Sequence, residues 1–405
     1  MLANWNDLTA ISVLELADKV RQRMNNSAVS DQQVQGLCKA VCEENKKYWL
    51  LDGCEKNKLI NEVFCTLRCE LEILQPLADD PSISEIMVNG KDDIFVERHG
   101  QIERVPINFE STDRLEHVIQ RLAARVGREI NDLNPIVDAR LADGSRVNAV
   151  NSNIALNGPI LTIRKFSKDR MNMADLIRQG DISEDAADFL KTLVRVGYNI
   201  FVSGGTSSGK TTFLNILSDY IPPQERVIVI EDSAELAIRG HENLVRLEAK
   251  NANAQGKGEI SIRDLIRASL RMRPDRIIVG EVRSGEVVDM LAAMSTGHDG
   301  SLSTGHANSP RGMLGRLETL FLSASGFPVE AVRSQIAEAI DIFVHLARTD
   351  DGKRRVMEIT ELYGYEDGYF KLNQIYKYKP GVGLEPTGAR LIRRDKLELA
   401  GLYEV

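Results

Sequence analysis

The chain has few of the features that mark membrane, secreted or nucleic-acid-binding proteins. No apolar run approaches the roughly 20 residues needed to span a bilayer, and residues 1–7 lack the basic and apolar segments of a signal peptide. Aromatic residues make up only 5% of the chain and the formal net charge is −8. These values argue against a surface that stacks bases or follows a phosphate backbone. We therefore expect a cytoplasmic protein, able to dock on a membrane protein, that binds no nucleic acid.

Cysteine is scarce, and all five cysteines lie within residues 1–70: Cys38, Cys42, Cys54, Cys65 and Cys69. In a cytosolic chain they should be reduced. The first two and the last two form i, i+4 pairs, each on one face of a helix. Four thiolates on two facing helices could hold zinc. The alternative is that they are small apolar residues in a helical core, and the stripe Val34, Leu37, Val41 around the first pair favours it.

A chain of 405 residues predicts two or three domains. Residues 1–75 carry three apolar stripes at helical spacing and predict a helical bundle that serves as a docking module. Gly53 and the charged stretch 55–58 separate the second and third helices. Pro76 breaks the pattern, and residues 76–166 follow as an α+β domain. Residues 167–180 are polar without periodicity and predict a linker, which leaves residues 181–405 as the largest domain.

The α+β domain is predicted from alternating apolar residues and turn signals. Strands are expected at 85–88, 94–98 and 101–105, a helix from 112 to 127, and further strands at 136–141, 146–150 and 160–166. The later strands carry a basic edge formed by Arg140, Arg146, Arg164 and Lys165. Each arginine alone is expected to be solvated surface. Two or three together could instead line an adjacent phosphate site.

In residues 181–405, apolar strands alternate with helices, which predicts a mostly parallel sheet with helices on both faces. The expected helices cover 186–196, 261–272 and 286–294, and the expected strands cover 200–202, 227–230, 276–279 and 301–306. Residues 249–260 have no apolar pattern and should be mobile. Residues 355–363 and 369–377 flank Asp367-Gly368 and predict an exposed hairpin.

The strand at 200–202 runs into the motif Gly204-x-x-x-x-Gly209-Lys210-Thr211, and an apolar helix follows. This is the phosphate-binding loop in its strand–loop–helix context. Its glycines let backbone N–H groups point at phosphate oxygens, and the helix adds its positive end. Lys210 would reach the β- and γ-phosphates, and the Thr211 hydroxyl would bind Mg²⁺. The predicted nucleotide-binding residues are Gly204, Gly205, Thr206, Ser207, Ser208, Gly209, Lys210, Thr211 and Thr212, and the predicted ligand is ATP with Mg²⁺.

Further charged residues follow the ends of the predicted parallel strands, the edge of the sheet where ligands bind. Glu231 and Glu281 could each hold Mg²⁺ or take the proton of the attacking water. His306 could donate to the γ-phosphate. Arg271, Arg273 and Arg283 surround the Glu281 strand and could neutralise developing charge in their own subunit or a neighbour's. Each residue taken singly could be a structural cap or a surface ion pair, and the sequence does not choose between the two glutamates as base.

Several of these segments together resemble the secretion ATPases of type II and type IV secretion systems and type IV pili, closest to the CpaF/TadA-type ATPases of tight-adherence pili. The resemblance covers residues 75–365. Residues 229–236 are similar to the family's Asp box, residues 270–283 to a Walker B segment with Gly280 in place of the usual aspartate, and residues 296–301 and 306–311 to its His box. Residues 135–146 resemble its N-terminal sensory domain, and residues 256–259 are also similar.

The resemblance implies a RecA-like P-loop NTPase core with a PAS-like α+β domain and a helical bundle before it. It implies a homohexamer that holds nucleotide between the two domains of each subunit. From their place in the sequence, we expect at least one of Arg140, Arg146 and Arg164 to reach the bound nucleotide when the two domains close. It also implies a polytopic inner-membrane platform protein as partner and a location peripheral to the inner membrane. Gly305 precedes His306 where the family pattern leads us to expect leucine, and a glycine there should loosen the position of His306.

Two other functions are compatible with the same loop. A hexameric nucleic-acid motor can share a RecA-like core, although the acidic charge and the low aromatic content oppose it. A nucleotide-gated scaffold would bind ATP with little turnover, although the complete set Lys210, Thr211, Glu231 and Glu281 opposes that. The main hypothesis is a hexameric ATPase that powers pilus assembly or protein secretion.

Overall fold

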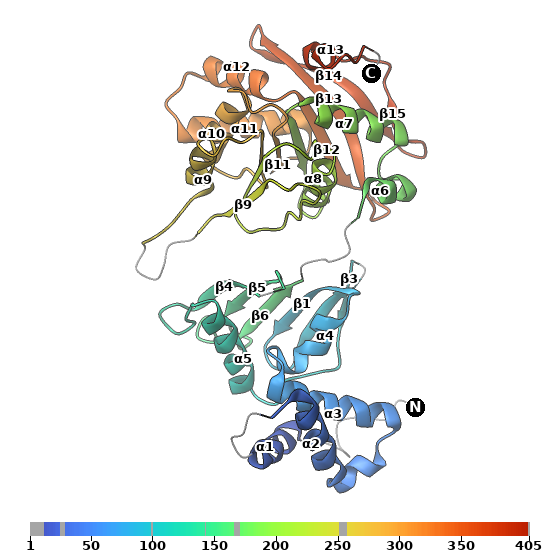
Figure 1. Cartoon of the computed structure of the whole chain (residues 1–405), viewed down its shortest axis with the longest axis vertical. Helices are drawn as coiled ribbons and strands as arrows, with labels where there is room; N and C mark the ends of the chain where they lie inside the picture. Colours follow the sequence, from blue (N-terminus) through green and yellow to red (C-terminus); the bar gives the residue numbers. More distant parts are fainter. Residues whose placement is uncertain are drawn as a thin grey trace. The chain divides into compact units, whose positions relative to one another are not determined.

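The computed structural model describes residues 12–24, 29–98, 100–141, 143–165, 171–250 and 257–403. The chain divides into two compact units, Met1–Lys168 and Asp169–Val405 (Figure 1). Among the described residues, no helix is long and apolar enough to cross a membrane. The predicted stripe positions Leu8 and Ile11 lie outside the described residues.

The first unit begins with the three predicted helices, α1 (Val13–Arg23), α2 (Asp31–Glu43) and α3 (Gly53–Arg68). A short 3-10 segment, Lys46–Leu50, joins α2 to α3. Gly53 and the charged residues after it do not separate helices, as predicted, but form the first turn of α3. Asp52 accepts a hydrogen bond from the N–H of Glu55, and the Glu55 carboxylate accepts one in return from the N–H of Asp52, so the charges cap the helix.

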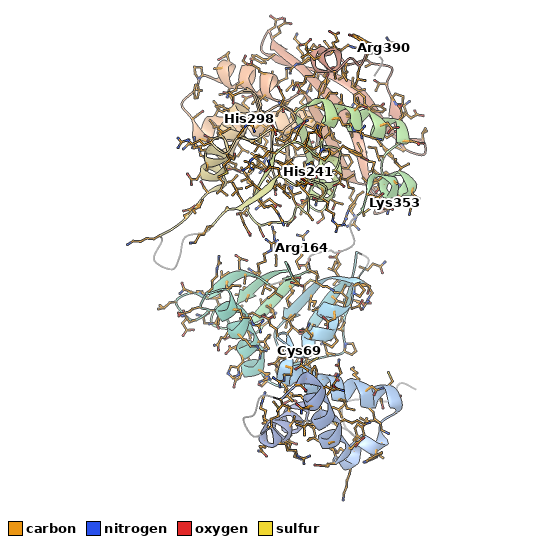
Figure 2. All side chains as sticks on the ribbon, viewed as in Figure 1. Cys69, Arg164, His241, His298, Lys353 and Arg390 are labelled. Atoms are coloured by element: carbon orange, nitrogen blue, oxygen red, sulfur yellow. The ribbon has the colours of Figure 1, made fainter. Side chains whose placement is uncertain are left out.

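The cysteines lie on these helices. Cys38 and Cys42 are buried in the bundle core beside Val34 and Val63, and burial raises their pKa values to about 11 and about 12. Cys69, labelled in Figure 2, follows the last turn of α3. Within the described ranges, no group of three or more histidine, cysteine or acidic side chains is placed to hold a metal ion. The first pair therefore occupies core positions of the bundle.

A six-stranded antiparallel sheet in the order β3-β2-β1-β6-β5-β4 forms the rest of the first unit. Its strands are β1 (Ile83–Asn89), β2 (Ile94–Arg98), β3 (Gln101–Arg104), β4 (Ile136–Arg140), β5 (Arg146–Val150) and β6 (Ile160–Arg164). Helix α5 (Thr112–Arg125) buries Leu115, Val118 and Leu122 in the same core as the sheet's apolar residues. Its N-cap is Ser111, one residue before the predicted start.

The predicted boundary at residue 75 falls inside this core. Leu71 and Leu74 pack with the sheet, and Pro76 begins the short helix α4 (Gln75–Asp79) instead of ending a helical region. Proline suits that position because the first N–H groups of a helix have no partner inside it. The 3-10 segment Glu72–Leu74 also carries a buried carboxylate, Glu72, which binds Arg114 and Arg121 of α5.

The second unit contains a nine-stranded sheet in the order β15-β14-β13-β12-β7-β11-β10-β8-β9. Neighbouring strands from β12 to β9 are parallel. They are β7 (Ile200–Gly204), β8 (Val227–Glu231), β9 (Leu244–Glu248), β10 (Arg276–Val279), β11 (Leu302–His306) and β12 (Ile342–Arg348). Strands β9 and β12 were not predicted. Residues 251–256 of the segment expected to be mobile lie outside the described residues, while Lys250 and Ile260 on either side form a β-bridge.

Helices cover both faces of this sheet, as predicted (Figure 1). Alternate strand residues divide between two cores: Ile200 and Val202 pack on one face and Phe201 on the other. Helices α6 (Met173–Gln179), α7 (Glu184–Val196) and α8 (Lys210–Ser218) lie on the first face. Helices α9 (Ile262–Ser269), α10 (Glu286–Met294), α11 (Pro310–Ala324) and α12 (Val329–Ala339) lie on the second.

Half of the predicted linker is the helix α6. Asn172 caps it, Gly180 ends it with a left-handed backbone (φ 75°), and its Met173 and Leu176 are buried in the core. The helix has only seven residues, so its sequence is too short to show a helical repeat of apolar residues.

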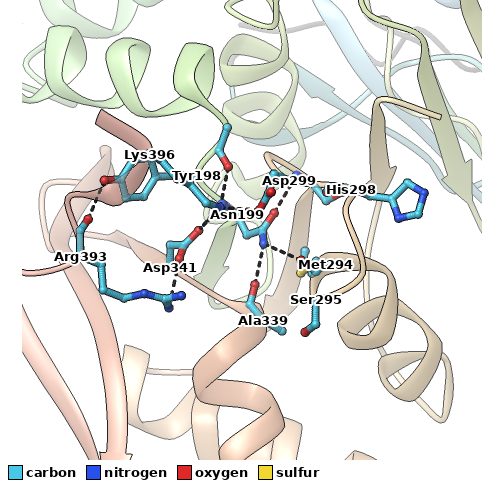
Figure 3. Close-up of polar contacts among 12 residues, drawn as sticks. Tyr198, Asn199, Met294, Ser295, His298, Asp299, Ala339, Asp341, Arg393 and Lys396 are labelled. Carbon is cyan, nitrogen blue, oxygen red and sulfur yellow. Dashed lines mark hydrogen bonds and ion pairs between the residues drawn. The ribbon is translucent and has the colours of Figure 1, made fainter. Parts of the chain in front are cut away.

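The C-terminal hairpin, β13 (Arg354–Glu366) and β14 (Tyr369–Lys379), was predicted to be exposed, but it extends the main sheet. Strand β13 pairs antiparallel with β12, and β15 (Gly383–Pro386) pairs with β14. A buried polar cluster ties the residues before and within α13 (Asp395–Leu399) to the start of β7 and β12 (Figure 3). There the Asp341 carboxylate accepts from the N–H of Asn199 at 2.9 Å and pairs with Arg393 and Lys396.

Candidate nucleotide site

The glycine-rich loop, residues 204–212, connects β7 to α8 in the strand–loop–helix arrangement that the motif requires. Gly204 allows close packing, because a Cβ there would lie 2.4 Å from the carbonyl oxygen of Leu346. Gly209 is the N-cap of α8 with φ at 92°, and Ser207 also has a positive φ of 58°. The backbone therefore forms a concave turn at the N-terminus of α8, an arrangement suited to an anion.

Lys210 is the cation of this loop. Its ammonium donates to the carbonyl oxygens of Gly204 at 3.2 Å and Gly205 at 2.7 Å, and Nζ lies 3.3 Å from His306 Nδ1. Burial lowers the pKa of Lys210. Among the described residues, none of the hydrogen-bond partners of this ammonium carries a negative charge, so phosphate oxygens could replace them.

His306 and Glu281 continue from Lys210 in a chain of contacts. His306 Nε2 lies 2.9 Å from Glu281 Oε1, and this buried oxygen accepts no hydrogen bond from the described residues. Arg283 donates to the other Glu281 oxygen at 2.8 Å. Burial and the neighbouring Lys210 lower the pKa of His306, which favours a neutral ring with Nδ1 accepting from Lys210.

The backbone holds Glu281 at this position. Val282 donates its N–H to the Thr304 carbonyl, and the Thr304 hydroxyl donates to the Gly280 carbonyl at 2.7 Å. Residue 281 is thereby fixed between β10 and β11, with its carboxylate facing the residue that ends β11. A carboxylate at such a position can accept a proton from water.

Glu231 has different surroundings. Its side chain is buried, and one carboxylate oxygen accepts from the N–H groups of Glu235 and Leu236 at 2.7 and 2.8 Å. Burial raises its pKa to about 7. A Cβ at Gly280 would lie 3.0 Å from the Glu231 Cγ. Glycine in the Walker B segment therefore leaves room for the Glu231 side chain. Glu231 orders the segment after β8 and does not contact Lys210.

The expectation that Gly305 loosens His306 is wrong. Backbone pairing in register with Ser203 holds Gly305 in β11, and a Cβ there would lie 2.8 Å from Met313 Cε and 3.0 Å from Phe201 Cε1. The family's expected leucine would not fit without movement of both side chains. His306 keeps its place through the strand and through its contacts to Lys210 and Glu281.

The other predicted residues of the loop differ in how far they are buried. Thr206 and Ser207 are exposed on the loop, and Thr211 and Thr212 are half-buried in the first turn of α8. The hydroxyl of Ser208 is buried without a hydrogen-bond partner among the described residues.

Arg271 and Arg273 precede β10, where the N–H groups of Asp275 and Arg276 donate to the carbonyl of Arg226, the residue before β8. They therefore lie at the opposite end of the parallel strands from Lys210 and do not join the site of their own subunit.

The arginines of the first unit form a row. Arg140 lies opposite Arg146, and Arg146 lies opposite Arg164, across β4, β5 and β6. Directly paired positions share one face of a sheet, with Cβ atoms about 5 Å apart, and like charges so placed repel one another.

Sequence reasoning missed His345 and Arg354. The Ser203 hydroxyl and His345 Nδ1 lie 3.0 Å apart beneath the loop, and burial lowers the pKa of the histidine. Arg354 begins β13, and its Cδ lies 3.4 Å from the position of a Cβ on Gly209. The positions of both residues depend on the pairing of β12 with β7 and β13. The apolar residues of 342–348 were the signal in the sequence that could have revealed β12.

A family model described as "Type II/IV secretion system protein" matches residues 68–375. The chain belongs to the type II/IV secretion system protein family. This is a family of ATPases that includes secretion and conjugal-transfer proteins. A Mycobacterium tuberculosis protein with a conjugal-transfer designation is 38% identical over 296 residues, which cover 72% of this chain and 84% of that protein. The type IV secretion system protein VirB11 of Brucella suis is 31% identical over 68% of this chain and 84% of its own length.

The fold is shared with two solved structures. The pilus retraction motor PilT with bound ADP matches 82% of this chain and 88% of its own, with 22% identity and a TM-score of 0.51. The ATPase DotB of Yersinia pseudotuberculosis matches 78% and 81%, with 17% identity and the same TM-score of 0.51. At these identities the likeness concerns the mixed α/β fold alone.

Proposed function

We propose that this family member is a Mg²⁺-dependent ATP hydrolase, of the CpaF/TadA-type branch, that works as a hexamer at the cytoplasmic face of the inner membrane and powers pilus assembly or protein secretion. The observation that carries the hydrolase proposal is the contact chain Lys210–His306–Glu281 beside the glycine-rich loop. It joins a phosphate-binding cation to a carboxylate able to accept a proton. The Asp-box, Walker B and His-box segments support the branch.

The residues present fit a nucleotide. The buried Ser208 hydroxyl has no partner among the described residues, and the Lys210 ammonium is held only by uncharged groups that phosphate oxygens could replace. The concave loop with Gly209 at positive φ adds backbone donors for the same oxygens. Thr211, Glu281 and Glu231 are the residues that would hold Mg²⁺ directly or through water. The ion would neutralise phosphate charge when bound.

Each residue then has a role in the reaction. Lys210 positions and neutralises the β- and γ-phosphates, and Glu281 takes the proton of the attacking water. His306 lies between Lys210 and Glu281. Loss of the γ-phosphate would change the contacts of Lys210 and, through them, those of His306. Arg283 holds the second oxygen of Glu281 and sets the orientation of the carboxylate. Glu231 positions the segment after β8.

We also propose that the second unit is a RecA-like core, that the sheet of the first unit with α5 is the PAS-like domain, and that the helical bundle docks a partner. A polytopic membrane platform protein is the expected partner of the hexamer. Relatives carry secretion and conjugal-transfer names, and a solved structure with the same fold is a pilus retraction motor. The proposal therefore concerns the supply of energy rather than the identity of the cargo.

Two variants test the hydrolase. Lys210→Ala should abolish nucleotide binding, because it removes the cation of the loop. Glu281→Gln should bind ATP with nearly the parent affinity and lose at least a hundredfold in turnover, the lower range for a general base. Steady-state phosphate release and fluorescent-nucleotide titration measure both. Normal hydrolysis by Lys210→Ala would refute the proposal, and full turnover by Glu281→Gln would refute the assignment of the base.

A further inference from the structure

The hairpin of β12 and β13 continues past the end of β7 beside the glycine-rich loop. Leu346 of β12 pairs with Gly204, the last residue of β7, and its carbonyl oxygen is so close that a Cβ on Gly204 would collide with it. Beyond this point Ala347 pairs with Arg355, and Arg348 pairs with Arg354. Two further residue pairs of the hairpin therefore lie along the segment where the loop replaces the strand.

Arg354 is the residue of this hairpin that meets the loop. Its Cδ would be 3.4 Å from a Cβ on Gly209, the N-cap of α8. The guanidinium is the group attached directly to Cδ. It therefore lies within a few ångströms of the N-terminus of α8, where the N–H groups for a phosphate are gathered.

Two neighbouring arginines of the hairpin already have partners. Arg355 pairs with Asp351 at 2.5 Å, and Arg348 donates to the Gly352 carbonyl at 3.1 Å. Arg354 is exposed, and its side chain makes no hydrogen bond or ion pair to any residue that the structure describes. Its charge acts on Asp181 only at a distance. The loop is thus flanked by a guanidinium that has no anionic partner in contact with it.

We propose that Arg354 is a second phosphate-binding cation of the site, which contacts the polyphosphate chain of the nucleotide together with Lys210; this rests on the proposed function. The assignment is to phosphate because a guanidinium is planar and binds phosphate oxygens in pairs. Its neighbour, the helix N-terminus, favours the same chemical group. Lys210 approaches from within the loop and Arg354 from the hairpin outside it.

Such a contact would connect nucleotide to the antiparallel half of the sheet. Arg354 is the first residue of β13, which runs between β12 and β14. Phosphate bound by both cations would hold the hairpin against the loop, and its release would free the hairpin. The loop and the C-terminal strands would then respond to the same ligand.

The test is the affinity of the full chain for ATP, ADP, GDP and inorganic pyrophosphate, measured in Arg354→Gln, in Arg354→Lys and in the parent. Arg354→Gln should weaken all four ligands by about tenfold, the effect of one charge-assisted contact. Arg354→Lys should fall between that variant and the parent, because an ammonium keeps the charge and loses the paired geometry.

Arg390→Gln is the matched control. Arg390 is an exposed arginine in the same unit, far from Lys353 and the hairpin turn (Figure 2), and its removal changes the net charge equally. Its affinities should equal the parent's. Unchanged affinities in Arg354→Gln would overturn the proposal, as would a loss confined to nucleotides that spares pyrophosphate. A parent that binds no nucleotide would instead contradict the proposed function.

Discussion

At the scale of single residues, Glu231 and Glu281 show how two carboxylates at one sheet edge acquire different properties. Glu231 ends β8 and Glu281 follows β10, and these parallel strands are neighbours in the sheet. Only 4% of Glu231 is exposed, and its charge is met by backbone N–H groups. Glu281 faces His306 and Arg283. The geometry therefore favours Glu281 as the base and gives Glu231 a positioning role.

The raised pKa of Glu231 predicts a pH-dependent stability. Between the usual value of 4.5 and about 7, the unfolded chain loses the Glu231 proton while the folded chain keeps it. The free energy of unfolding should therefore fall as pH rises through this range, by about 3 kcal/mol, and stay constant above it. Glu231→Gln removes the titration and should become more stable relative to the parent from pH 4.5 to 7.

Denaturant titrations of both proteins across this pH range measure the difference. The exposed Glu259→Gln is the control and should follow the parent at every pH. A difference between Glu231→Gln and the parent that does not change with pH would show that Glu231 is not titrated by burial in this way.

At the scale of elements, the contact between β11 and α11 determines which residue can precede His306. Strand β11 places Gly305 over Met313 of α11 and Phe201 of β7. The space for a larger side chain is absent because strand and helix pack directly at this point. Glycine here allows close packing of elements, in contrast to its usual role of freeing the backbone.

Gly305→Leu should therefore destabilise the protein by about 1–3 kcal/mol, since overpacking forces neighbouring side chains from their positions. Thermal unfolding of the full chain measures this. Combining it with Met313→Ala should restore part of the loss, because that change removes the closest obstructing atoms.

Gly315→Ala, also on α11, is the control, since a Cβ at Gly315 meets no atom within 4 Å. It should leave stability unchanged or raise it by up to about 1 kcal/mol, the helical preference for alanine over glycine. Parent-like unfolding of Gly305→Leu would show that the contact can relax without loss.

At the scale of the whole molecule, the site in the second unit offers cations in the glycine-rich loop, while the first unit carries an arginine row of its own. The row Arg140, Arg146, Arg164 sits at paired positions of three strands, and Glu85 pairs with the last of them. Like charges at directly paired positions repel one another. Because a guanidinium binds phosphate oxygens in pairs, we propose that nucleotide phosphate is a ligand of at least one arginine of this row.

We expect at least one of Arg140→Ala, Arg146→Ala and Arg164→Ala to lower ATP turnover tenfold or more, because an arginine that neutralises transition-state charge contributes at least that much. Thermal unfolding should change little in that variant. Arg104→Ala, on the opposite edge strand β3 and paired with Asp93, is the control and should hydrolyse ATP normally. If all three variants match the parent, the arginines of the first unit do not serve the nucleotide.

The sequence alone determined the elements whose signals are local. The strand–loop–helix around Lys210, the capped helices α2, α5 and α9, and the antiparallel strands of the first unit follow from short patterns of glycine, capping residues and apolar periodicity. The carboxylates at the strand ends were predictable because parallel strands of one sheet end at one edge.

Tertiary structure decided the features that depend on which strands are neighbours. The choice between Glu231 and Glu281 depends on burial, and the placement of Arg271 and Arg273 away from Lys210 depends on strand direction. The need for Gly305 depends on packing, and the position of Arg354 depends on the pairing of β12 with both β7 and β13. Such contacts cannot be read from the linear sequence, because the partners are separated by up to about 150 positions and meet only when the sheet forms.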